Sequence, residues 1–365
     1  MNLTFLSVRF DNYIYNYIYN YKIIKELGKG YNGISYLVEK NKKQYVIKRQ
    51  KLLQKEVNPN TKYMFWREIE FEKMINKLPK SQEQYFMKMY KYSVTKCDYQ
   101  HQPNWVDPCM KKDLENRNKS KFCLDTVIEY KGNVLYNLYK KGFTLKEKYC
   151  LIIQLLYALE IIRKKDFMHQ DIHQGNITYQ KIDKPIKIYG KTLKCKNQYS
   201  LIDYGLVKNI KFCQTKKDKT EFEYLYKTNN DVYELMYQIV LQQYMLYSIY
   251  IDKKWDIPKF NSKNIFRKLY EDKILWNKIK ELLPEDEKWF KYYERNLKTD
   301  KKNWVIGEKV EYLFSALDRK KYLKLVGWKN ILPNFIPKKD LIFMVQNITD
   351  NKKIIKYFLN KLTIY

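Results

Sequence analysis

Residues His169–Asn176, HQDIHQGN, bring two histidines, an aspartate, a glycine and an asparagine into one short polar stretch. An apolar segment precedes it: Thr144–Lys165 (TLKEKYCLIIQLLYALEIIRKK) has apolar residues at helical spacing and ends in basic residues. Thr144 and Glu147 at the start of this segment match a capping box. The pattern predicts a buried helix that leads directly into the polar stretch.

A second apolar segment follows the polar stretch. Tyr199–Gly205 (YSLIDYG) predicts a strand that ends in an Asp-aromatic-Gly turn. Two acids, Asp171 and Asp203, are therefore expected to project from neighbouring loops. A single aspartate in a loop most often caps a turn or a helix. Here the order and context of the whole set favour a chemical role instead.

The order His-x-Asp-x-x-x-x-Asn, followed by a strand and Asp-aromatic-Gly, resembles the catalytic and metal-binding loops of the protein-kinase superfamily. The resemblance implies that Asp171 accepts the proton of a substrate hydroxyl, while Asn176 and Asp203 hold Mg²⁺ on the phosphates of ATP. The residue types suit these roles. Magnesium prefers hard oxygen ligands, and an acid beside the acceptor hydroxyl can orient it for in-line attack.

The resemblance implies an α+β fold of the bilobal protein-kinase type, with a small β-rich N-lobe that has one main helix and a larger helical C-lobe. A chain of 365 residues with 45% hydrophobic residues is large enough for such a core. We expect an N-terminal extension at 1–20, an N-lobe at 21–130 with an insertion at about 96–121, and a C-lobe at 131–365.

The composition is strongly basic, with 71 Lys and Arg against 40 Asp and Glu and a formal net charge of +31. Such a field favours anionic partners: nucleotides, acidic protein segments, nucleic acid or anionic lipid. Lys, Asn, Ile and Tyr are all abundant, which AT-rich coding sequence also produces, so the charge alone does not choose the partner. AT-rich usage in a divergent kinase would suit a large DNA virus or a protist.

Tyr21–Lys40 (YKIIKELGKGYNGISYLVEK) predicts a strand, a glycine-rich turn and a second strand. Gly-x-Gly-x-x-Gly also occurs in dinucleotide-binding folds, but there it opens into a helix. Here a third strand follows and ends at Lys48, which resembles the kinase nucleotide lid and its phosphate-binding lysine. Glycines let backbone amides approach phosphate oxygens. The implied nucleotide-binding positions are Gly28, Lys29, Gly30, Gly33, Ser35, Val46 and Lys48, with Ser35 where kinases usually have Val and Val46 where they usually have Ala.

Lys62–Leu78 (KYMFWREIEFEKMINKL) predicts an amphipathic helix. Kinases place a glutamate on this helix to pair with the lysine of the third strand. Glu68 fits this role best by register, and Glu70 is the alternative. A surface pairing along the helix would be the purely structural role.

Phe122–Tyr130 (FCLDTVIEY) again predicts a strand, and Lys-Gly follows it. This order resembles the kinase hinge, in which Ile128 would guard the back of the nucleotide pocket. Backbone groups of Glu129 and Lys131 would then contact adenine. A plain strand followed by a turn explains the same residues without a ligand.

The text LIDYGL resembles the vaccinia-related kinases, within the casein-kinase-one group, more than other branches. The resemblance implies a short, basic activation segment at Val207–Asn230. Asp231 would then begin a buried helix and brace the catalytic loop, and it could also act as an ordinary helix cap.

His173 departs from the pattern of Ser/Thr kinases, which carry a lysine two residues after the catalytic aspartate. A histidine is mostly neutral near pH 7, so His173 would donate a hydrogen bond to the transferring phosphoryl group, or transfer would be slower. The same text resembles the loop of kinase-like small-molecule phosphotransferases. A Ser/Thr protein kinase that modifies proteins, with acidic proteins as the expected acceptors, is the first hypothesis. The alternatives are a small-molecule phosphotransferase, a pseudokinase scaffold and a nucleic-acid-binding protein.

The six cysteines are scattered and form no Cys-x-x-Cys pair, which favours reduced thiols in an intracellular protein, in the cytoplasm, or in a host cytoplasm or virion if the source is viral. A metal site from the neighbouring Cys97, His101, Cys109 and Cys123 is a weaker alternative, because their spacing matches no zinc pattern. No signal peptide and no membrane-spanning run is expected.

Overall fold

The computed structural model describes residues 21–30, 32–97, 99–103, 111–135, 138, 144–235, 273 and 336–362. The chain divides into two compact units, one of Met1–Asp231 with Thr349–Tyr365 and one of Val232–Ile348. Helix α15 (Lys338–Gln346) belongs to the second unit. The N-terminal extension expected at 1–20 lies outside the described residues.

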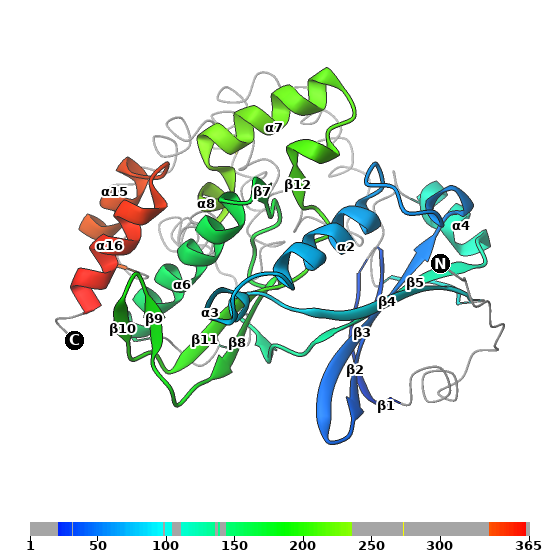
Figure 1. Cartoon of the computed structure of the whole chain (residues 1–365), viewed down its shortest axis with the longest axis horizontal. Coiled ribbons are helices and arrows are strands. Elements are labelled where there is room, and N and C mark those ends of the chain that lie inside the picture. The colour runs from blue at the N-terminus through cyan, green and yellow to red at the C-terminus, as the bar shows by residue number, and fades with distance from the viewer. Residues whose placement is uncertain are drawn as a thin grey trace. The chain divides into compact units, whose positions relative to one another are not determined.

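An antiparallel sheet of five strands, drawn in blue to cyan in Figure 1, forms the first part of the described chain. The strands lie in the order β1-β2-β3-β5-β4. Val38, Ile47 and Val127, one from each of three neighbouring strands, pack with Tyr21 in a buried cluster. The strands are β1 (Lys22–Lys29), β2 (Gly33–Lys40), β3 (Lys43–Leu52), β4 (Met89–Lys96) and β5 (Phe122–Glu129).

Helix α2 (Met64–Ile75) occupies most of the segment predicted to be an amphipathic helix. A 3₁₀ turn (Gln54–Glu56) precedes it and the short helix α3 (Lys80–Glu83) follows it. The indole nitrogen of Trp66 donates a hydrogen bond of 2.7 Å to the carbonyl of Glu56, which fixes the start of α2. The sheet and these helices confirm the α+β class.

Helix α6 (Leu145–Arg163) forms where helical spacing predicts it, and the capping box of Thr144 and Glu147 is confirmed. The helix is apolar nearly all round, as expected of a buried helix. Its one buried amide, Gln154, donates to the carbonyl of Asn197 at 3.0 Å and accepts from the backbone N–H of Tyr199 at 3.0 Å. Helix α16 (Asn351–Leu362) packs against α6.

Short strands carry the polar stretch and the second acid. Strand β8 (Ile177–Lys181) directly follows the polar stretch and pairs with β11 (Asn197–Leu201). The long connection between them contains a hairpin, and a third strand completes the sheet in the order β11-β8-β6. These are β9 (Ile186–Ile188), β10 (Lys191–Leu193) and β6 (Asn133–Val134), while β7 (Phe167–Met168) pairs with β12 (Lys208–Asn209).

The segment 207–230 is mostly ordered secondary structure. A 3₁₀ turn (Ile210–Phe212) leads into helix α7 (Lys216–Thr228), and Thr215 and Asp218 form a capping box at its start. Asn229 ends α7 in the left-handed conformation, φ 57°, and α8 (Asn230–Leu235) follows.

The expectation of reduced thiols is wrong for four of the cysteines. Cys97 pairs with Cys123 and Cys150 with Cys195, with Cα–Cα distances of 5.8 and 6.0 Å. Each pair meets only when distant segments pack together, so sequence spacing gives no sign of it. The alternative metal site is also wrong for Cys97 and Cys123, because their sulfurs bond each other. Cys213 is free, and Cys109 lies outside the described residues.

In the described part of the chain, no helix is both long and apolar enough to cross a membrane.

Candidate active site

Lys48 of β3 joins two acids that come from distant parts of the chain. Its amine lies 2.7 Å from Glu68 Oε1 on α2 and 2.9 Å from Asp203 Oδ1 in the loop after β11. The Lys48 and Glu68 side chains are 14% and 3% exposed, whereas that of Asp203 is 46% exposed. Glu70 instead pairs with Lys73 on the exposed side of α2, at 2.6 Å. The buried pair is thus Lys48–Glu68, and the accessible acid is Asp203.

Lys48, Glu68 and Asp203 shift one another's pKa values. Burial alone would lower the pKa of Lys48, but the carboxylates of Asp203 and Glu68 outweigh it and raise that pKa. The amine of Lys48 in turn lowers the pKa of Asp203. Burial raises the pKa of Glu68, an effect that Lys48 opposes. Lys48 and Asp203 are therefore charged at neutral pH.

Glu72, which the sequence analysis did not single out, is also part of this group. It lies one turn after Glu68 on α2 and is 1% exposed. Burial, and then the neighbouring Glu68, raise the pKa of Glu72 well above its ordinary value. Its Oε2 atom has no hydrogen-bond partner among the described residues. The spacing of four from Glu68 was the available signal, because it puts both acids on the same helix face.

The polar stretch brings Asp171 and Asn176 into contact. The amide nitrogen of Asn176 donates to Asp171 Oδ2 at 2.7 Å and to the Asp171 carbonyl at 3.1 Å. The Asn176 carbonyl accepts from the backbone N–H of Ile202 at 2.9 Å, just before Asp203. This bond joins the loop that carries Asp171 to the loop that carries Asp203.

Asp231 binds the backbone at the start of the polar stretch. Its carboxylate accepts the backbone N–H groups of His169 at 2.7 Å and Gln170 at 2.9 Å. The His169 ring is fully buried and its Nε2 donates to the Ile202 carbonyl at 3.1 Å. Burial lowers the pKa of His169, which favours the neutral form of the ring. Asp231 and His169 hold the loop, and they are not themselves exposed for chemistry.

His173 lies against Asp171. Its Nδ1 accepts the backbone N–H of Gly175 at 3.0 Å, so the proton of the neutral ring is on Nε2. Nε2 faces Asp171 Oδ1 at 3.6 Å. A Cβ atom at Gly175 would lie 2.9 Å from the His173 ring, so a larger residue there would displace the ring. The ring thus presents an N–H to the carboxylate of Asp171.

Asp203 itself, and Gln170 directly before Asp171, adopt the left-handed backbone conformation. Gln170 has φ 62° and Asp203 has φ 58°. This conformation is uncommon for residues other than glycine and is concentrated at functional sites, where the surrounding structure enforces it. Here Gln170 is held by its hydrogen bond to the Asp231 carboxylate, and Asp203 is held by its ion pair with Lys48.

The glycine-rich turn between β1 and β2 has one glycine that the fold needs and two that leave open space. A Cβ at Gly33 would lie 2.1 Å from the carbonyl oxygen of Arg49, so β2 and β3 pair closely only with glycine there. Among the described residues, nothing lies within 4 Å of a Cβ built at Gly28 or Gly30. Lys29 pairs with Glu26 at 3.5 Å on the same strand. The backbone of Gly28 and Gly30 is therefore open on the side where a side chain would be.

The remaining positions expected to bind a nucleotide lie on neighbouring strands. Ser35 is opposite Lys48, and Val46 is opposite Ile128, in the register of the sheet. After β5, the amine of Lys131 pairs with Glu129 at 3.0 Å. The backbone N–H of Glu129 donates to the Lys88 carbonyl at 2.8 Å, so this N–H is already used within the fold. Gly132 is required, because it has φ 86° and a Cβ there would meet the Tyr179 carbonyl.

The predicted residues thus form two sets, within each of which the side chains lie close together: Lys48, Glu68 and Asp203, and Asp171, His173 and Asn176. The bond between Ile202 and Asn176 joins the loops that carry Asp203 and Asp171. Models of known protein families and the curated proteins that were searched give no match to this chain.

Proposed function

We propose that this protein is an ATP-dependent phosphotransferase with a bilobal kinase-like fold, and that it transfers the γ-phosphoryl group of MgATP to Ser or Thr hydroxyls of proteins. The observation that carries the proposal is the bridge from Lys48 to Glu68 and Asp203, next to the Asp171–Asn176 pair. A lysine held between two acids supplies a fixed positive charge for phosphate oxygens.

The residues present fit a magnesium ion. Lys48 takes Oδ1 of Asp203, whose side chain is half-exposed, so Oδ2 is the oxygen that would bind a cation. Asn176 uses its amide nitrogen on Asp171, so its side-chain oxygen is the group left to bind a cation. When bound, Mg²⁺ would neutralise phosphate charge during transfer. Asp203 and Asn176 would hold it.

Asp171 would accept the proton of the attacking hydroxyl. The hydrogen bond from Asn176 orients the Asp171 carboxylate. Gln170, which is left-handed and bonded to Asp231, fixes the backbone directly before Asp171. The glycine-rich turn, with open space at Gly28 and Gly30, would place backbone amides near the phosphates. Glu129 and Lys131 would contact adenine through their backbone. Catalysis would thus be mainly positioning and electrostatics.

A small-molecule phosphotransferase is the second candidate. The observation that favours it is His173 against Asp171, where Ser/Thr kinases carry a lysine. A pseudokinase scaffold is less favoured, because the two ion pairs of Lys48 are intact. The basic composition supports acidic protein acceptors for the first candidate, and nucleic acid stays an alternative partner. The two disulfides favour an oxidising setting such as a virion over a reducing cytoplasm.

Phosphate transfer from labelled MgATP tests the proposal. The purified chain is incubated alone, with acidic and basic proteins, and with a panel of hydroxylated metabolites. Asp171→Ala and Asp203→Asn are the matched inactive variants. We expect label on protein that both variants lose by at least about a hundredfold. Label on metabolites alone would support the second candidate, and an Asp203→Asn variant with unchanged activity would refute both.

A further inference from the structure

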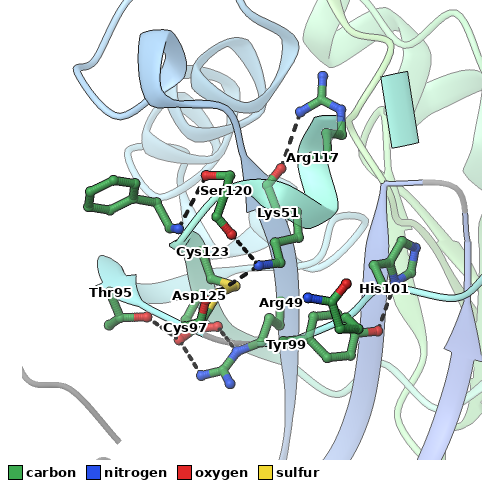
Figure 2. The surroundings of a disulfide bond; sticks show 12 residues. Arg49, Lys51, Thr95, Cys97, Tyr99, His101, Arg117, Ser120, Cys123 and Asp125 are labelled. Carbon is green, nitrogen blue, oxygen red and sulfur yellow. Dashed lines mark hydrogen bonds and ion pairs between the residues drawn. A yellow bond between two sulfur atoms is a disulfide. The ribbon is translucent and has the colours of Figure 1, made fainter. Parts of the chain in front are cut away.

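The insertion between β4 and β5 is closed at its base by covalent and polar bonds (Figure 2). The Cys97–Cys123 disulfide joins its two ends. Beside the disulfide, the buried amine of Lys51 donates to the carbonyl of Ser120 at 2.6 Å and to that of Cys97 at 3.3 Å. Both ends of the insertion are therefore fixed to β3 as well as to each other.

A buried ion pair supports this base within the sheet. Arg49 of β3 donates to both carboxylate oxygens of Asp125 on β5, at 2.6 and 2.7 Å. Thr95 of β4 donates to the same carboxylate at 3.2 Å. Such a two-bond pairing of Arg and carboxylate fixes direction as well as distance. The side chains thus tie the adjacent strands β3, β5 and β4 together near the disulfide.

From this base, residues 99–103, here called the strap, reach the glycine-rich turn. Tyr99 packs in a buried cluster with Ile34, at the start of β2, and with both cysteines of the disulfide. His101, 1% exposed, has its Nε2 atom 2.7 Å from the carbonyl oxygen of Gly30. A carbonyl oxygen only accepts, so Nε2 is the donor. The strap therefore bonds directly to the backbone of the turn.

The orientation of His101 is set from both sides. Its Nδ1 is paired with the Tyr99 hydroxyl at 2.7 Å. Its backbone N–H donates to Asn118 Oδ1 at 2.7 Å, and Asn118 Nδ2 donates back to the His101 carbonyl at 2.8 Å. Asn118 lies on helix α4 (Lys111–Lys119) of the same insertion. Ring and backbone are both fixed, so the hydrogen bond to Gly30 is built into the fold.

We propose that His101 is a positioning residue for the glycine-rich turn, and that the Cys97–Cys123 disulfide holds it in place. The inference rests on the proposed function only for the ligand, a nucleoside triphosphate whose phosphates the turn would contact. Gly28 and Gly30 have no side chains to anchor the turn. A turn that is ordered before binding avoids the ordering cost when phosphates bind.

The first experiment measures amide hydrogen exchange of the turn, Gly28 to Gly33, in the full chain without nucleotide. His101→Leu should speed exchange in the turn about fivefold, since it removes one net hydrogen bond. His101→Gln keeps an amide donor and should restore part of the protection. Asn118→Ala, which leaves the ring intact, should also loosen the turn, so the test survives if His101→Leu does not fold.

The two disulfides provide a matched pair of variants. Cys97→Ser with Cys123→Ser should speed exchange in the turn, whereas Cys150→Ser with Cys195→Ser should leave the turn unchanged. If neither the first pair nor His101→Leu alters exchange at the turn, the proposal is wrong. An equal effect from both disulfide variants would show general loosening and would also overturn it.

The second experiment measures binding of a fluorescent ATP analogue with Mg²⁺. His101→Leu should weaken the affinity, and raise the KM for ATP, about fivefold while changing kcat less. If the wild-type chain binds no nucleotide, the proposed function fails, while the exchange data still decide whether His101 positions the turn. If the wild type binds and His101→Leu binds equally well, the positioning role fails and the proposed function stands.

Discussion

Lys48 and Asp203 are 155 residues apart in the sequence, yet their amine and carboxylate lie 2.9 Å apart. Glu68, on a third element, holds the same amine at 2.7 Å. The arrangement leaves one acid buried and the other half-exposed. Under the proposed function, Glu68 orients the lysine and Asp203 is the acid that holds the metal ion.

Lys48→Met should keep the fold but remove most turnover, because the fixed charge at the phosphates is lost. It also leaves Glu68 buried without its cation, so we expect a loss of about 1–3 kcal/mol in the free energy of unfolding. Adding Glu68→Gln should recover much of this stability without restoring activity. Denaturant unfolding and phosphate transfer measure the two effects. Recovery of activity in the double variant would contradict the assignment of Lys48.

Glu72→Gln should change the pH dependence of stability. Burial raises the pKa of Glu72 well above its ordinary value, so its contribution to stability is fully present below the unfolded pKa near 4.5 and is lost as the pH rises through the folded pKa. The free energy of unfolding of the wild type should therefore fall above about pH 5 more than that of Glu72→Gln.

Thermal unfolding across this range measures the Glu72 effect. Glu70→Gln is the control, because Glu70 lies on the exposed side of the same helix and pairs with Lys73. It should leave the pH profile as in the wild type. Identical profiles for Glu72→Gln and the wild type would show that Glu72 carries no such linkage.

His173→Ala should lower kcat about tenfold to a hundredfold with little change in the KM for ATP, because the ring faces Asp171 rather than the glycine-rich turn. His173→Gln keeps an N–H donor and should retain more activity than the alanine variant. His173→Lys supplies the charge that Ser/Thr kinases carry, and higher transfer to protein in this variant would favour the first candidate function. Steady-state kinetics with Asp171→Asn as the inactive reference make the comparison.

Loss of the Cys150–Cys195 disulfide should lower the free energy of unfolding by about 3–4 kcal/mol, since it closes a loop of 45 residues. Cys97–Cys123 closes a shorter loop of 26 residues and should contribute slightly less by the same mechanism. Unfolding of the two Cys→Ser pairs, with and without reductant, measures this. Equal stability of the Cys150→Ser, Cys195→Ser variant and the wild type would contradict the expectation.

Local sequence patterns predicted most of the elements around the site. The helix at Leu145–Arg163 followed from apolar spacing and from the Thr144–Glu147 cap, both of which act within a few residues. The strands on either side of the glycine-rich turn followed from alternating and β-branched residues in the same way. The glycine at position 33 is explained only by the paired strand, which brings the Arg49 carbonyl to the place of a Cβ.

By itself, the sequence determined which residue types are available for phosphate chemistry and in what order they occur, because motif spacing and secondary structure depend on neighbouring residues. Tertiary structure alone decided that burial raises the pKa of Glu72, that Cys97 meets Cys123, and that His101 bonds the Gly30 carbonyl. Each of these depends on contacts between segments that are distant in the chain and come together only in the folded protein. A local sequence pattern does not predict such contacts.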